Sequence, residues 1–210
     1  MRPEAEPTRR ERTRVALREA ALRRFVDDGF DATSVADIAA DVGVTPRTFY
    51  RYFASKDEVL FSDYEARLDW FRRALSVRPR RESITTAVLN AIESFPDDPQ
   101  VVSEIARLRA GELDARRIEP HIRRAEAELG REIESHLLER DGTRADAGDD
   151  RPFLAAVAAR SIAAAVFAAL DRWMAGPDHD LAELSRLTAL ALETLDHGLG
   201  PRRARARPRR

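Results

Sequence analysis

The segment from Thr33 to Lys56 constrains the fold most, because it predicts two short helices joined by a sharp turn. Ser34 has an aspartate three positions later, a pattern typical of the N-cap that begins a helix. Gly43 supplies the turn. Thr45 then caps a second helix whose first residue is Pro46, where the missing N–H group costs nothing. The two helices would bury their apolar side chains between them, which is the spacing of a helix-turn-helix.

The rest of the chain favours helices as well. Its apolar residues recur with helical periodicity and not with strand alternation, and only 9 of the 210 residues are glycine. The expected helices cover residues 12–28, 34–42, 45–54, 55–75, 83–95, 99–111, 119–140, 152–175 and 180–198. The fold class is therefore expected to be all-α.

The second short helix would expose a basic and aromatic set of side chains. These are Pro46, Arg47, Thr48, Tyr50, Arg51 and Tyr52. Such a helix fits the major groove of DNA, where arginine can bond guanine with two N–H groups and threonine or tyrosine can contact thymine methyls and phosphates. A generic three-helix core with a charged surface is the alternative, and Tyr50 alone has the further alternative of packing inside.

Residues 12–60 resemble the TetR family of repressors. The resemblance is carried by Gly29-Phe30, Thr33-Ser34, Asp37-Ile38-Ala39, Gly43-Val44-Thr45, Thr48-Phe49-Tyr50, Tyr52-Phe53 and Ser55-Lys56. Beyond residue 60 only the length and the helix order agree. The resemblance implies that Ser34, Tyr52 and Lys56 contact phosphates. It also implies base-facing or nearby positions for Pro46, Arg47, Thr48, Tyr50 and Arg51, and Thr45 completes the expected DNA-binding set.

The chain divides into four expected parts. Residues 1–11 form a basic flexible leader, 12–56 the three-helix DNA-binding domain, 57–198 a helical effector-binding and dimerisation domain, and 199–210 a disordered arginine-rich tail. Their charges differ: residues 1–56 carry a net +2, residues 57–198 a net −9, and the tail +6. An acidic body with basic ends can meet a polyanion only at those ends. The leader can reach phosphates or form a solvated helix start.

The last two expected helices, 152–175 and 180–198, have the size and order of the pair that forms a four-helix bundle between two subunits in TetR-like proteins. The first carries small residues that allow close helix approach, namely Ala155, Ala156, Ala159, Ala163, Ala164 and Ala168. A core within one subunit is the alternative. DNA geometry favours a homodimer, because one short helix reads too few base pairs for useful specificity.

The second domain also carries residues that are candidates for an effector pocket. Five aromatic residues can line a ligand pocket or belong to an ordinary core: Trp70, Phe71, Phe95, Phe167 and Trp173. Arg160 lies within an apolar helix and needs an acidic side chain, a carbonyl or an anionic ligand as partner. The stretch Phe49–Phe53 and the arginine-rich middle of the second domain look similar to TetR-like regulators with acyl-CoA effectors. The resemblance thus implies a ligand-responsive repressor that binds a palindromic operator in double-stranded DNA and is released by an apolar or anionic small molecule, with acyl-CoA or a fatty acid as first candidates.

Other functional classes have little support. The chain has no cysteine and no phosphate-binding glycine loop, and its 4 histidines are scattered, so we expect no enzyme, no metal site and no cofactor. Residues 153–170 are apolar enough to suggest a membrane span, but Arg160 near their middle favours a buried helix of a cytoplasmic protein. A DNA-binding or architectural protein that senses no ligand remains the alternative, and the size of the second domain argues against it.

Overall fold

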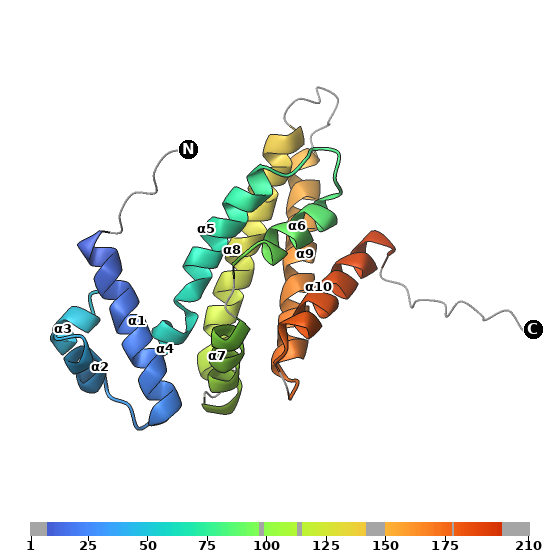
Figure 1. Ribbon diagram of the computed structural model, residues 1–210. Helices are drawn as coiled ribbons and strands as arrows, with labels where there is room; N and C mark the ends of the chain where they lie inside the picture. The colour runs from blue at the N-terminus through green and yellow to red at the C-terminus, as the bar shows by residue number, and fades with distance from the viewer. Residues whose placement is uncertain (1–7, 97–98, 113–114, 142–149, 178, 199–210) are drawn as a thin grey trace, which may run out of the picture.

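The computed structural model describes residues 8–96, 99–112, 115–141, 150–177 and 179–198. Within these ranges the fold is all-α, as expected, and no strand occurs (Figure 1). The helices are α1 (Arg9–Asp27), α2 (Val35–Asp41), α3 (Pro46–Phe49), α4 (Lys56–Phe61), α5 (Asp63–Ser76), α6 (Ile84–Glu93), α7 (Pro99–Glu112), α8 (Ala115–Asp141), α9 (Arg151–Met174) and α10 (Leu181–Asp196).

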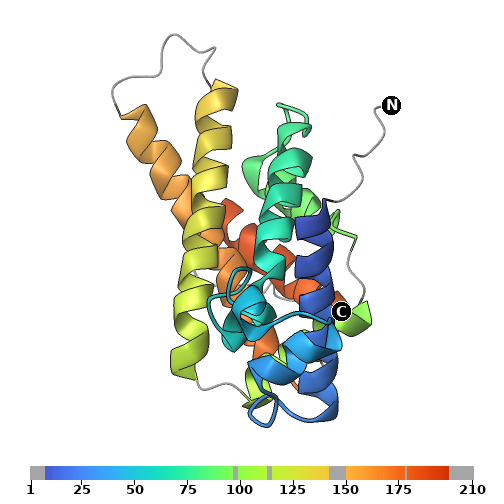
Figure 2. The same ribbon diagram turned by 90° about the vertical axis from the view of Figure 1, so that its left-hand side faces the viewer.

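Helices α1 to α4 share a core of large apolar side chains, which we call the N-terminal core. It consists of Leu17, Ala20, Ala21, Phe25, Phe30, Ile38, Phe49, Phe53, Val59, Leu60, Phe61 and Leu108. Helices α2 and α3 lie on the outer side of α1, and Figure 2 shows them in front when that side faces the viewer. The N-terminal core therefore holds α3 at an outer edge of the molecule.

Two expected domain boundaries are wrong. Residues 9–11 are not part of a flexible leader but the first turn of α1, because Thr8 and Glu11 form a reciprocal capping box there. The expected limit at residue 56 also falls too early, since Val59, Leu60 and Phe61 of α4 are buried in the N-terminal core. The N-terminal domain thus extends to the end of α4.

The helix expected over residues 55–75 is interrupted at Ser62. The Ser62 hydroxyl donates to the carbonyl of Val59 at 2.7 Å, and its backbone N–H bonds the same carbonyl at 3.3 Å. This local turn replaces a regular i to i−4 bond and separates α4 from α5. Two consecutive helices separated by a turn, and not one continuous helix, therefore connect the two domains.

The second core, which we call the C-terminal core, lies between α5, α6, α8, α9 and α10. Its buried members are Phe71, Leu75, Ala87, Val88, Ala91, Ile122, Leu129, Ile133, Ala159, Ile162, Ala163, Phe167 and Leu192. Helices α8 and α9 lie side by side, and α10 packs across α9 and α6 (Figures 1 and 2). Tyr64 and Ile118 pack against both cores, so the two domains meet without a gap.

Helix α8 begins at Ala115 and not near Pro120, where its start was expected. A proline inside a helix removes one backbone bond and clashes with the preceding turn, at a cost of about 3 kcal/mol. Ile118 lies in the turn that precedes the proline and packs against both cores. That burial offsets part of the cost and explains why the helix continues through the proline.

Helix α9 is long and apolar enough to cross a membrane by length and composition, with a mean hydropathy of 2.1 over its most apolar window. In the fold it packs along α8 and α10 and contributes Ala159, Ile162, Ala163 and Phe167 to the C-terminal core. One face of α9 is therefore buried in the C-terminal core, whereas Phe153, Leu154 and Val157 on α9 are exposed, so the helix is only partly the buried helix that was expected.

Candidate nucleic-acid interface and effector pocket

Helix α3 is fixed by its first turn and by one buried ring. The Thr45 hydroxyl accepts the backbone N–H of Thr48 at 3.2 Å, and Pro46 occupies the first helical position. Gly43 adopts a φ of 69°, a left-handed conformation that favours glycine, and so turns the chain between α2 and α3. Phe49 is fully buried in the N-terminal core. These contacts leave the opposite face of α3 toward solvent.

The solvent-facing side of α3 and of the turn after it carries most of the expected DNA-binding set. Pro46, Arg47, Tyr50 and Arg51 are exposed. Tyr50 is 56% exposed, and its ring lies perpendicular to that of Phe49 with the ring centres 5.6 Å apart. The alternative in which Tyr50 packs inside is therefore wrong for this structure.

Three further residues of the set have structural partners. Thr48 is half-buried and its hydroxyl lies 3.1 Å from that of Thr45. Tyr52 is half-buried and packs against the N-terminal core. Ser34 remains exposed at the start of α2, where it caps the helix together with Asp37. The exposed N-terminal turns of α2 and α3 present backbone N–H groups, which attract anions.

Helix α2 is anchored to α1 by a two-point ion pair. Arg24 Nε donates to Asp41 Oδ2 at 2.6 Å and Arg24 Nη2 donates to Oδ1 at 2.8 Å. The side-chain hydrogen bonds from Arg24 hold the pKa of Asp41 below its usual range. This pair fixes the angle between α1 and the helix-turn-helix.

Lys56 is placed differently from the expectation of a phosphate contact. Its ammonium donates to the carbonyl of Thr33 at 2.8 Å and also to the carbonyl of Phe30. It also lies 4.2 Å from the centre of the Phe30 ring. The ammonium therefore ties α4 to the loop before α2, and this geometry favours a structural role over a reach toward DNA.

The fold of α1 to α4, with α3 outermost, defines a helix-turn-helix DNA-binding protein. The family model described as bacterial regulatory proteins of the tetR family matches residues 17–62, which run from within α1 to the end of α4. Over 206 residues the chain is 32% identical to the transcriptional regulator TcmR of Streptomyces glaucescens. The aligned region covers 88% of this chain and 83% of TcmR. The chain therefore belongs to the TetR family of transcriptional regulators, which bind DNA and are not enzymes.

Other relatives agree. BetI of Rhizobium meliloti is 31% identical over 63% of this chain and 64% of its own length. Among solved structures, the lauroyl-CoA complex of the repressor FadR of Thermus thermophilus has a TM-score of 0.57 at 21% identity, covering 92% of this chain and 98% of that one. A TetR-family regulator of Mesorhizobium loti gives 0.56 at 21% identity, covering 90% and 96%. These structural likenesses show the fold of both domains.

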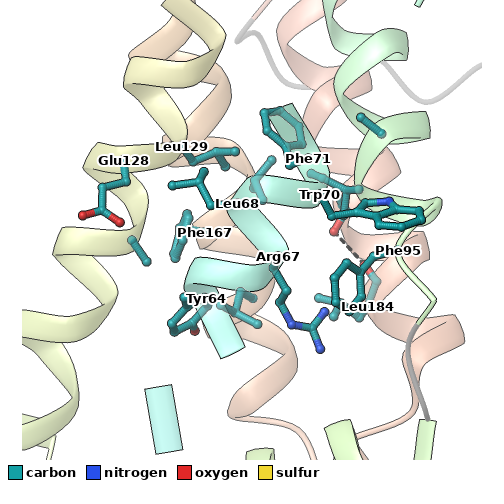
Figure 3. A pocket seen from close by; sticks show the side chains of 16 residues that line it. Tyr64, Arg67, Leu68, Trp70, Phe71, Phe95, Glu128, Leu129, Phe167 and Leu184 are labelled. Carbon is teal, nitrogen blue, oxygen red and sulfur yellow. Dashed lines mark hydrogen bonds between the residues drawn. The ribbon is translucent and has the colours of Figure 1, made fainter. Parts of the chain in front are cut away.

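A pocket of about 170 Å³ opens between α5, α6, α8, α9 and α10 (Figure 3). Its lining is almost entirely apolar and includes Leu68, Trp70, Phe71, Ala91, Ile92, Phe95, Ala125, Leu129, Val166, Phe167, Leu170 and Leu184. Tyr64, Arg67, Glu128 and Thr188 supply the polar groups. The composition suits an apolar molecule that carries few polar groups.

The aromatic rings of the pocket hold one another in place. Trp70 Nε1 donates to the Ser94 hydroxyl at 3.0 Å, and its ring meets Phe95 edge to face at 5.9 Å. Arg67 points toward the same rings, with its guanidinium 4.7 Å from the centre of Phe95 (Figure 3). Glu128 lies at the opposite wall, where Arg124 donates to it at 2.9 Å. The two charged groups thus lie at opposite sides of an apolar space.

The structure brings four of the six expected pocket residues together, namely Trp70, Phe71, Phe95 and Phe167. The expectation for Trp173 is wrong for this pocket, because its indole N–H bonds the Asp180 carbonyl at 2.7 Å in the turn between α9 and α10. The expectation for Arg160 is also wrong. Arg160 is exposed on α9 in the single subunit and does not line this pocket.

Sequence reasoning missed the polar lining. Tyr64, Leu68 and Phe71 form the apolar stripe of one helix, and Arg67 is the cation that lies beside this stripe. An arginine at the edge of an apolar stripe is a usable signal, because its charge needs a partner there. Glu128 gives no comparable signal, since α8 carries many acidic residues.

Proposed function

We propose that this protein is a ligand-responsive repressor that binds a palindromic operator as a homodimer and releases it when an apolar, acidic small molecule fills the pocket. The carrying observation is the pocket itself, whose α5 wall continues through Ser62 into α4 of the DNA-binding domain. This helix connection is the most direct path from the pocket to the DNA-binding domain. The proposed cellular location is the cytoplasm, where DNA and small metabolites are both available.

For the DNA contacts, exposure supports Arg47 and Arg51 as readers of bases and Ser34 and Tyr50 as neighbours of phosphates or methyl groups. Arg47 lies in the first turn of α3, the part of a recognition helix that meets base edges. The fit of a dimer to two half-sites requires the two copies of α3 to lie about one DNA turn apart, ~34 Å.

For the dimer, an exposed apolar stripe on α9 supports contact with a second copy. Phe153 is 66% exposed, Leu154 61% and Val157 47%, and Leu190 on α10 is 37% exposed. The small residues Ala164 and Ala168 continue the exposed side of α9. Ala159 and Ala163, expected at the same interface, are instead buried within the subunit.

The pocket also favours an effector with one acidic group over a highly charged one. Arg67 is the sole cation among the described residues that line it, and Glu128 opposes a second negative charge. A fatty acid or an aromatic acid meets these conditions. An acyl-CoA is a further candidate effector, but its nucleotide part would have to lie outside the pocket.

A protein that binds DNA without sensing a ligand is the second candidate, and the pocket argues against it. The test is fluorescence anisotropy of a labelled operator, titrated with protein in the presence of decanoic acid, lauroyl-CoA or aromatic acids. Release of operator by at least one of these supports the repressor. The architectural alternative would be favoured if the protein binds operator but no ligand of a broad panel raises its thermal unfolding temperature.

A further inference from the structure

One buried carboxylate joins the pocket to the end of α4. Asp63 is the first residue of α5, and its side chain is 15% exposed. Its Oδ2 accepts Arg67 Nε at 3.2 Å, and its Oδ1 accepts Arg109 Nη2 at 3.0 Å. Arg67 lines the pocket, whereas Arg109 comes from α7. A single carboxylate thus connects two arginines that serve different parts of the molecule.

Arg109 holds the joint between α4 and α5. Its Nε donates to the carbonyl of Leu60 at 3.1 Å, and its Nη2 donates to the same carbonyl. Its guanidinium lies 4.7 Å from the centre of the Phe61 ring and 5.1 Å from that of Tyr64. The arginine side chain is 7% exposed, so these contacts replace its hydration. Arg109 therefore fixes the last turn of α4 while it pairs with the first residue of α5.

The charges around the Asp63 carboxyl are mainly positive. Burial alone would raise the pKa of Asp63, but Arg109, Arg67 and Arg18 together hold that pKa below its usual range. The carboxylate is thus ionised when the pocket is empty. Arg67, which pairs with Asp63, also lines the pocket. An acid group that enters the pocket therefore meets a cation that Asp63 already binds.

We propose that Asp63 is the positioning residue that couples an acidic effector to α4. The effector's acid group pairs with Arg67 and competes with Asp63 for the same guanidinium. Repulsion between the two carboxylates then weakens the Asp63–Arg67 pair and leaves Asp63 held by Arg109. Because Arg109 also donates to the Leu60 carbonyl, a shift of Asp63 changes the angle between α4 and α5 at Ser62. The inference rests on the proposed function and names the residues that transmit it.

The test compares decanoic acid with 1-decanol, which has a similar chain but no charge. Trp70 lines the pocket, so its fluorescence reports binding of either probe. In the wild type, operator should weaken the binding of decanoic acid about 5- to 150-fold, the usual range of coupling between two sites. In Asp63→Asn this factor should fall below about twofold, because no second carboxylate then competes. Asp69→Asn is the matched control, an exposed aspartate of α5 that pairs with Arg72, and it should keep the wild-type factor.

Arg67→Met is the second variant. It should weaken decanoic acid roughly tenfold or more through the lost charged hydrogen bond, while 1-decanol binds within about threefold of wild type. Circular dichroism and thermal unfolding establish that each variant is folded before it is titrated.

The outcomes separate the two levels of the proposal. Full coupling in a folded Asp63→Asn protein, or equal losses of both probes in Arg67→Met, overturns the role of Asp63 and leaves the proposed function standing. If neither probe binds the wild type or alters its operator affinity, the proposed effector class is wrong and this inference falls with it.

Discussion

The ammonium of Lys56 lies over the ring of Phe30, with Nζ 4.2 Å from the ring centre. The same ammonium bonds two carbonyls of the loop that leads into α2. Because these contacts are internal, Lys56→Met should lower the free energy of unfolding by about 2 kcal/mol, the scale of a charged hydrogen bond. Denaturant titration measures this change.

The control for Lys56 is Arg51→Met, at an exposed position beyond α3. It should leave the free energy of unfolding within about 0.5 kcal/mol of wild type but weaken operator binding, because Arg51 is proposed to face the DNA bases. The reverse pattern, with stability unchanged in Lys56→Met and salt dependence reduced, would restore the phosphate contact as the role of Lys56.

Arg47→Ala should weaken operator binding by about 1–3 kcal/mol per half-site and relax sequence preference, because a two-point contact with a base is lost. The measurement is anisotropy on the operator and on a random duplex at fixed salt. Loss of equal size on both duplexes would show that Arg47 contacts only the DNA backbone.

His121 predicts a pH dependence of stability. Its ring stacks on Phe61 at 4.3 Å, and burial lowers its pKa despite the opposing charges of Asp57 and Glu58. The folded protein therefore binds this proton less readily than the unfolded chain does. The stability from neutral His121 is present above the unfolded pKa of about 6.5 and is lost as pH falls through the folded pKa.

His121→Phe keeps a ring on Phe61 but removes the titration. Its unfolding free energy should fall less than that of the wild type between about pH 7.5 and pH 5, by denaturant titration at each pH. His136 also has a pKa lowered by burial, so some dependence remains. An identical pH profile for His121→Phe and wild type would contradict the prediction.

Phe153→Glu tests the apolar stripe of α9. A charge within a subunit contact is costly to bury, so the variant should sediment as a monomer and lose at least about tenfold in operator affinity at equal concentration. Val77→Glu is the control, because Val77 is 79% exposed at the end of α5. A dimeric Phe153→Glu protein would place the subunit contact elsewhere.

The sequence predicted the starts of α2 and α3 because the signals there are local, although α3 ends at Phe49 and not near Ala54 as expected. The caps at Ser34 and Thr45, the glycine turn and the proline at the first helical position act within a few residues, and all four are present in the structure. The exposure of Arg47 and Tyr50 follows from the same periodicity.

Several of the remaining errors arise from contacts between distant residues. The turn at Ser62 is local, but the Leu60 carbonyl beside it is bound by Arg109, which lies 49 positions away in the chain. The family resemblance implies a phosphate contact for Lys56, and nothing near Lys56 in the sequence indicates that it binds the carbonyls of Phe30 and Thr33. Arg160 seemed buried because its neighbours are apolar, yet an apolar stripe on a subunit surface has the same composition as a core.

Leu108 of α7 is 7% exposed within the N-terminal core, although it lies far beyond the helix-turn-helix in the chain. A fragment that ends after α4 would expose to water the apolar surface that this side chain covers, which would lower the stability of the fragment. We therefore expect the DNA-reading half to be less stable alone than within the full chain. Exchange of recognition helices between relatives should succeed only when the graft carries a matching residue in α7, and heating should melt both halves in one cooperative transition.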